Sequence, residues 1–106
     1  MRNILPHKSI DAGDLSASIT GSATNISHIT DVAYQGVFTG SPVGALGIEG
    51  SIDGVNYVEM DTKSIAGAGS VLFDLPLLSF CWIRPVYTRT SGSGALTVWI
   101  FAKGRD

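Results

Sequence analysis

Charge is scarce in this sequence of 106 residues, because only 15% of them are Asp, Glu, Lys or Arg, against about 25% in an average protein. Seven basic and nine acidic residues give a net charge of −2. Proteins that bind nucleic acid through its phosphates concentrate positive charge, so this composition argues against such a protein. The hydrophobic content of 44% excludes a disordered chain, since disordered chains are poor in apolar residues. A chain of this length forms about one domain around one core.

Cysteine, histidine and long apolar runs are equally scarce. Cys81 is the only cysteine, so a single chain has no internal disulfide and no cysteine-based zinc site. No apolar run approaches the ~20 residues of a membrane helix. His7 and His28 are the only histidines, the acidic residues are spread singly, and no nucleophile elbow or phosphate-loop motif occurs. We therefore expect no enzyme activity, no cofactor and no metal site.

Helical periodicity is also missing, since apolar residues nowhere recur at helical spacing over a window of about eleven residues. Short alternating segments are instead separated by Gly, Ser, Pro and Asn clusters, a pattern typical of a sandwich or barrel. We predict an all-β fold, a single antiparallel β-sandwich of jelly-roll or immunoglobulin-like type with an extended N-terminal arm. The predicted strands are 15–20, 25–30, 32–39, 44–52, 56–60, 71–75, 80–90 and 95–103.

The strongest turn signal is Asp53-Gly54, a pair typical of a two-residue hairpin turn that needs positive φ. Pairing the flanking strands across such a turn places Ile48 opposite Glu59, which brings no two acids together. Residues 63–70 are rich in Gly, Ala and Ser, and we predict that they form a flexible loop.

The last two strands are predicted to form a hairpin closed by residues 91–94. In this hairpin Val86 faces Trp99, and Arg84 faces Phe101. One face is aliphatic throughout and is predicted to be core: Ile83, Pro85, Tyr87, Leu96, Val98, Ile100 and Ala102. The opposite face is also rich in apolar residues and has Arg84 as its only strongly polar one, whereas the exposed face of an antiparallel sheet is normally polar. Its apolar members are Trp82, Val86, Trp99 and Phe101.

Residues 1–13 are predicted to be an N-terminal arm, and residues 14–106 the sandwich domain. Pro6 has no backbone donor, so this segment should not be a central strand. Ile4 and Leu5 are apolar, and a free arm that carried them would be poorly soluble. The segment is therefore either a disordered terminus or an arm that docks on a neighbouring subunit.

Two explanations account for the apolar outer face of the predicted hairpin. Either the arm or the long loop of the same chain covers it, or another subunit does. Burying a large aromatic side chain contributes ~1.5–3 kcal/mol, and a large exposed apolar patch favours aggregation. We therefore expect association with copies of the chain or with a larger assembly. The predicted contact residues are Ile4, Leu5, Trp82, Arg84, Val86, Trp99 and Phe101.

Two stretches, which together cover 30 of the 106 residues, resemble known proteins. Residues 44–57 (GALGIEGSIDGVNY) resemble the G-x-L-x-I-x-x-S-x-D-G-x-x-W/Y hairpin of small bacteriophage virion proteins and of discoidin-like sugar-binding modules. Residues 83–98 (IRPVYTRTSGSGALTV) look like the V-R-L-x-Y-T-x-T-S-G-x-G-T-L-T-V ending of the phage proteins. The sequence departs from these patterns at Tyr57, where Trp is commoner, and at Pro85, which replaces an aliphatic residue.

The resemblance implies a non-enzymatic structural protein of a bacteriophage particle. It would be a capsid decoration or cement protein, or a small neck or tail component, that acts through subunit–subunit contacts. Its partners would be other copies of the chain and a major capsid or tail protein, with no nucleic acid and no membrane. It would be assembled in the host cytoplasm and reside in the virion. The alternative is a discoidin-like carbohydrate-binding or adhesion module, in which Trp82 or Trp99 stacks on a sugar ring.

Overall fold

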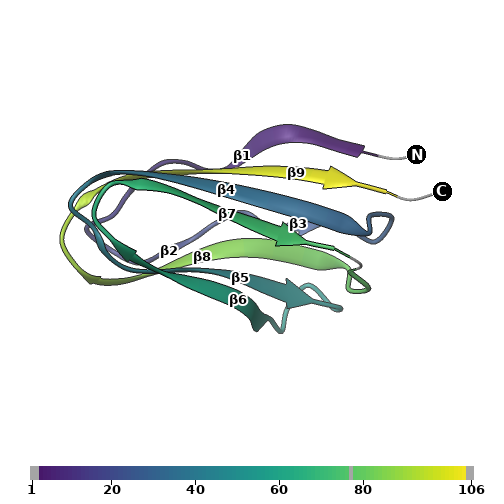
Figure 1. Ribbon diagram of the computed structural model, residues 1–106. Helices are drawn as coiled ribbons and strands as arrows, with labels where there is room; N and C mark the ends of the chain where they lie inside the picture. Colours follow the sequence, from purple (N-terminus) through teal and green to yellow (C-terminus); the bar gives the residue numbers. More distant parts are fainter. Residues whose placement is uncertain (1–2, 77, 105–106) are drawn as a thin grey trace.

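The alternating segments of the sequence form two antiparallel sheets that pack face to face (Figure 1). The computed structural model describes residues 3–76 and 78–104. Sheet A has the strand order β1-β9-β4-β7, and sheet B has the order β2-β8-β5-β6, with β3 also paired to β8. The predicted all-β antiparallel sandwich is confirmed. The strands are β1 Asn3–Asp14, β2 Ile19–Thr20, β3 Thr24–Asn25, β4 Asp31–Gly40, β5 Val43–Ser51, β6 Val58–Ala66, β7 Gly69–Leu75, β8 Trp82–Ser91 and β9 Gly94–Lys103.

The core follows the alternation of side chains along the long strands. In β4, Val32, Tyr34 and Phe38 are buried, because successive residues of a strand point to opposite faces and these three share the inward one. The aliphatic face predicted for residues 83–102 is also buried. The sequence pattern therefore correctly separates the inward from the outward positions of these strands.

The predicted final hairpin is wrong, because β8 and β9 lie in different sheets. β8 pairs with β5, so that Val86 lies opposite Gly47. β9 lies between β1 and β4, and Trp99 therefore has Lys8 and Gln35 as its strand neighbours. The outward residues of the two strands consequently project from opposite sides of the sandwich.

Residues 91–94 carry the chain from sheet B to sheet A instead of closing a hairpin within one sheet. Beside them, residues 40–43 cross in the opposite direction, from β4 in sheet A to β5 in sheet B (Figure 1). The two crossings are joined where the Ser41 amide donates to the Ser93 carbonyl at 2.9 Å. Strands β4–β5 and β8–β9 thus form one long two-stranded ribbon that is bent across both sheets.

The segment predicted as an arm lies in the same sandwich from residue 3 onward. It forms β1, an edge strand of sheet A that pairs with β9, and Ile4 lies opposite Ala102 there. Pro6 falls within the first of three register shifts along this pairing. An edge strand with irregular pairing tolerates a residue without a backbone donor, so the proline does not detach the segment.

Most of the predicted loop 63–70 is strand. β6 continues to Ala66, and its Ile65 is buried in the core. β7 begins at Gly69. The predicted strand 15–20 shrinks to β2, and the predicted strand 25–30 is absent apart from Asn25, which ends β3. Within the described ranges, no helix is long and apolar enough to cross a membrane.

Candidate functional site

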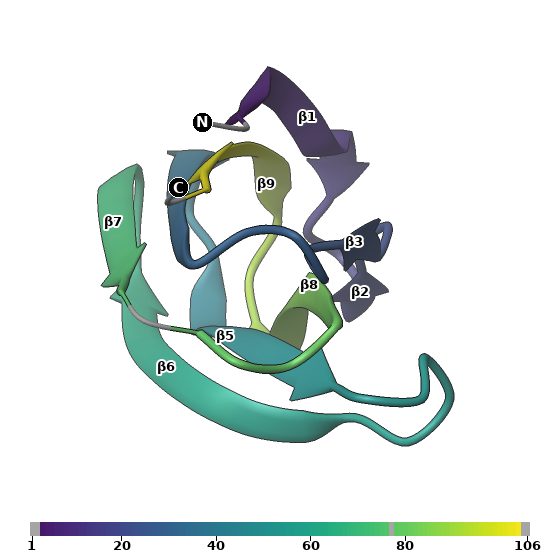
Figure 2. The same ribbon diagram turned by 90° about the vertical axis from the view of Figure 1, so that its right-hand side faces the viewer.

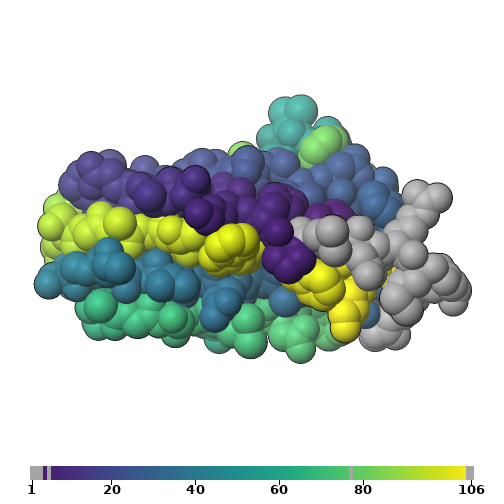
Figure 3. All heavy atoms as spheres, turned by 90° about the horizontal axis from the view of Figure 1, so that it is seen from above, coloured from purple at the N-terminus to yellow at the C-terminus, as the bar shows by residue number. Residues whose placement is uncertain are grey.

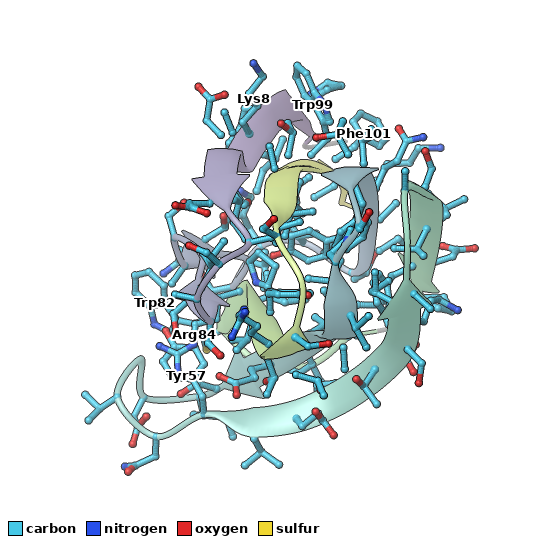
Figure 4. All side chains as sticks on the ribbon, turned by 90° about the vertical axis from the view of Figure 1, so that its left-hand side faces the viewer. Lys8, Tyr57, Trp82, Arg84, Trp99 and Phe101 are labelled. Atoms are coloured by element: carbon cyan, nitrogen blue, oxygen red, sulfur yellow. The ribbon has the colours of Figure 1, made fainter. Side chains whose placement is uncertain are left out.

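The predicted contact residues separate into two groups on opposite outer faces (Figure 4). Trp99 and Phe101 project from sheet A, whereas Trp82, Arg84 and Val86 belong to sheet B. The prediction that all five share one face is therefore wrong, since it depended on the final hairpin. Their outward direction is nevertheless as the alternation predicts.

The outer face of sheet A carries an apolar hollow formed by all four of its strands. Figure 3 looks onto this face, where β1, β9, β4 and β7 lie side by side. Trp99 is 37% exposed and Leu72 is 62% exposed. β1 lies beside β9 in the sheet. The hollow, of about 260 Å³, is lined by Pro6, Ala33, Tyr34, Gln35, Leu72, Trp99, Ile100 and Phe101.

Two lysines lie over the aromatic rings of this hollow. The Lys8 ammonium is 5.3 Å from the Trp99 ring centroid, and the Lys103 ammonium is 5.8 Å from that of Phe101. Lys8 also forms an exposed ion pair with Asp11 at 3.3 Å. Cation–π contacts at exposed sites contribute only about 0.5–1 kcal/mol. Contacts this weak do not prevent the rings from packing against a partner.

The predicted arm residues differ from this group. Ile4 is half-buried and packs against the core cluster, so most of its apolar surface is already used within the chain. The side chain of Leu5 lies outside the described residues. Its predicted role in a contact stays a prediction.

The outer face of sheet B carries a different arrangement, centred on Arg84. Its Nε donates to Glu49 Oε1 at 2.9 Å, and its second terminal nitrogen lies 2.8 Å from the same oxygen. The guanidinium also stacks on Tyr57, 3.7 Å from the ring centroid. Both charged side chains are largely shielded from solvent, which strengthens a charge-assisted hydrogen bond. Arg84 thus ties β8 to β5 and to the connection that follows β5.

That connection is longer than the predicted two-residue turn. Residues 52–57 link β5 to β6, and the pairing shifts register next to Glu49. As a result Glu49 lies opposite Glu59, whereas Ile48 lies opposite Asp61. The predicted pairing of Ile48 with Glu59 is wrong for this reason.

Asp53 organises the connection. Its Oδ1 accepts hydrogen bonds from the backbone amides of Asn56 at 2.8 Å and Val55 at 2.9 Å, and from Ser51 Oγ at 2.9 Å. The next residue, Gly54, packs on Trp82, because a Cβ at Gly54 would lie 3.0 Å from the indole nitrogen. The connection therefore covers part of Trp82, which leaves that side chain half-buried.

The hydrogen bonds to Asp53, above all that from the Asn56 amide and next that from the Val55 amide, hold the pKa of its carboxyl well below its usual range. A lowered pKa stabilises the fold at every pH above the ordinary carboxyl value of about 3.9, and this contribution is lost as pH falls through the lower value. We expect Asp53→Asn to be less stable than the wild type above about pH 5, and the two to converge toward pH 2. Urea unfolding across this pH range measures the difference. A constant difference would contradict the assignment.

Sequence reasoning missed three residues of these surfaces. Glu49 contacts Arg84 because β5 pairs with β8, which the predicted final hairpin did not include. Tyr57 contacts Arg84 from the connection 52–57, which is longer than the predicted two-residue turn. Leu72 belongs to the hollow on sheet A. Its position between the partly buried Val71 and the buried Phe73 carries a signal that was available, since neighbouring strand residues cannot all face inward.

The fold defines the class of the protein as a two-sheet antiparallel β-sandwich whose sheets share a bent ribbon. No known protein family and no curated protein sequence matches the chain. The PBSX exported protein XepA has a TM-score of 0.76 at 10% identity, and the match covers 96% of this chain and 38% of XepA. The chain therefore spans well under half the length of XepA.

Two further solved structures share the sandwich. The SPBc2 prophage-derived protein YomS has a TM-score of 0.63 at 7% identity, with 94% of this chain and 93% of YomS covered. The VP2 subviral particle protein of infectious bursal disease virus has a TM-score of 0.57 at 16% identity, with 97% of this chain and 32% of VP2 covered. At such identities the likeness establishes the fold alone. None of these three structures supports the resemblance of residues 44–57 to discoidin-like modules.

Proposed function

We propose that the chain is a non-enzymatic structural subunit of a bacteriophage particle that acts through contacts with other subunits. The observation that carries this proposal is the apolar hollow on sheet A, whose Trp99 and Leu72 are exposed. Burying a large apolar side chain contributes about 1.5–3 kcal/mol. A subunit that gives these side chains a partner would therefore be strongly favoured over solvent.

Two similarities support a phage particle in particular. Residues 83–98 resemble the ending of small phage virion proteins, and the fold resembles that of the prophage-derived YomS. The low charge of the sequence and its apolar outer face also suit a permanent interface, because obligate interfaces are more hydrophobic than transient ones.

Within the particle, we propose a capsid decoration or cement role, with a neck or tail component as the second possibility. The partner of the sheet A hollow would be a major capsid or tail protein. A cement protein gains its strength from many simultaneous contacts rather than from one tight site. A rigid sandwich with one apolar face is suited to that role.

Quantitative mass spectrometry of gradient-purified particles from a host that carries the gene tests the proposal. We expect the chain to sediment with the particles at a fixed ratio to the other structural proteins. A copy number close to that of the major capsid protein would favour decoration, and a few copies per particle would favour the neck or tail. Particles free of the chain, with all of it in the soluble fraction, would overturn the proposal.

Carbohydrate binding is the second candidate function, and the Arg84 cluster favours it. A sugar site combines an aromatic platform with charged groups, and Trp82 and Tyr57 lie near Arg84 and Glu49 on one outer face (Figure 4). However, Arg84 and one face of Tyr57 are already engaged with each other. Glycan-array binding that is lost in a folded Trp82→Ala or Trp99→Ala variant would establish this alternative.

A further inference from the structure

The free edges of the two sheets differ in how they are protected. An edge strand presents unpaired backbone N–H and C=O groups, and it pairs with another chain unless it is short, charged, irregular or interrupted by proline. The edges of sheet A are β1 and β7, and those of sheet B are β6 and the short strands β2 and β3.

Three of these edges carry protective features. β1 contains Pro6 and Lys8, and three register shifts interrupt its pairing. β6 has an irregular pairing next to Glu49 and carries several charged side chains along its length. β2 and β3 are two residues long, which is too short to template another strand.

β7 lacks most of this protection. All seven of its residues pair with β4 in one continuous register. It contains a single charge, Asp74, and no proline. Leu72 at its centre is 62% exposed. In the part of the chain that the structure describes, β7 pairs with β4 alone, and Figure 2 shows it at the margin of the molecule.

We propose that the free edges of β7 in two copies of the chain pair antiparallel about a two-fold axis at Leu72. The two four-stranded sheets would then continue into each other, and the two apolar hollows would lie on one continuous face. This inference rests on the proposed function, because it names one subunit contact within the assembly. An isologous contact of this kind is the commonest way in which identical subunits associate.

The sequence of β7 is complementary to itself in this register. Leu72 lies opposite Leu72 of the partner subunit on the outer face, and Val71 lies opposite the partner's Phe73 on the inner face. Aromatic and β-branched cross-strand pairs are stabilising. Asp74 lies opposite the partner's Ser70, whose hydroxyl is able to donate to a carboxylate. Parallel pairing would instead place the two Asp74 carboxylates close together, so the charges also favour the antiparallel arrangement.

Sedimentation velocity over a range of protein concentrations tests the pairing. We expect the wild type to form dimers, and Leu72→Lys and Leu72→Glu each to raise the dissociation constant on the order of tenfold or more, because each places like charges opposite each other. An equimolar mixture of the two variants should form dimers again, since lysine then faces glutamate across the axis. Only a contact that brings residue 72 next to itself predicts this rescue.

Val37→Lys is the matched control. Val37 is 38% exposed and lies on the outer face of sheet A, in β4 and away from the free edge. We expect this variant to dimerise like the wild type. Ser70→Glu, which would face the partner's Asp74, is a second edge variant expected to dissociate the dimer, and it keeps the test valid if a substitution at Leu72 unfolds the chain.

Three results would overturn the edge pairing: a monomeric wild type, a folded mixture that stays monomeric, or a Val37→Lys variant that dissociates as strongly as Leu72→Lys. These results are separate from the particle measurement. A chain that is found in particles and is monomeric in isolation contradicts the β7 contact alone. A chain that forms the dimer and is absent from particles contradicts the proposed function alone.

Discussion

Gly94→Ala should cost the fold about 3 kcal/mol or more, while Gly69→Ala should cost only about 1–2 kcal/mol. The two glycines have nearly the same backbone angle, φ 151° and φ 150°, so alanine suffers similar backbone strain at both positions. They differ in their surroundings. A Cβ at Gly94 would collide with the carbonyl oxygen of Thr39 and lie 3.3 Å from Gly40 Cα, whereas a Cβ at Gly69 would meet nothing within 4 Å.

The difference in unfolding free energy between the two variants measures how closely residues 91–94 pack against the crossing at residues 40–43. At Gly94 the obstacle is backbone, which cannot rotate away as a side chain can, so the two strand crossings would have to separate. Urea unfolding followed by tryptophan fluorescence gives both free energies, provided that the two variants have the same m-value as the wild type. Equal losses in the two variants would mean that the crossings are not in contact.

The crossing at residues 91–94 also explains where prediction from the sequence ends. Alternation along residues 83–102 correctly predicts which side chains are buried, since that property depends only on the period of a strand. The partner of each strand is a long-range property. A Ser-Gly-Ser-Gly run permits a hairpin within one sheet as readily as a crossing between two sheets, and nothing local distinguishes the two. What decides the outcome is the crossing at residues 40–43, about fifty positions earlier in the sequence.

The side chains of the candidate surfaces were also predictable only in part: their direction follows from the sequence, but their neighbours do not. That Trp99 and Arg84 point outward follows from alternation. That Arg84 is held by Glu49 depends on the pairing of β8 with β5, which the predicted hairpin excluded. The register at Glu59 depends on the hydrogen bonds to Asp53, which lengthen the connection beyond two residues. Side-chain chemistry inside a loop therefore changed the neighbours of residues in the adjoining strands.

The two tryptophans, which the sequence placed on one face, should respond very differently to aspartate. Trp82→Asp should cost about 2–4 kcal/mol of stability, since large buried aromatic residues lose about 3–5 kcal/mol on truncation and Trp82 is only half-buried. The new carboxylate would also lie under the connection that packs on the indole, close to the Asp53 carboxylate. Two like charges there would repel each other.

Trp99→Asp should cost less, about 0.5–1.5 kcal/mol, because Trp99 lies on the outer face of sheet A and no acidic loop lies among the described residues around it. The side chain is 37% exposed and projects from sheet A, where the Lys8 ammonium, now 5.3 Å from the ring, is placed to pair with the new carboxylate. Chemical unfolding measures both variants, and the amount of folded Trp99→Asp protein that is incorporated into particles measures the contact. We expect this variant to be folded and excluded from particles. If Trp99→Asp destabilises the fold as much as Trp82→Asp, then Trp99 is an ordinary core residue, and the hollow on sheet A is not the surface by which the protein joins its assembly.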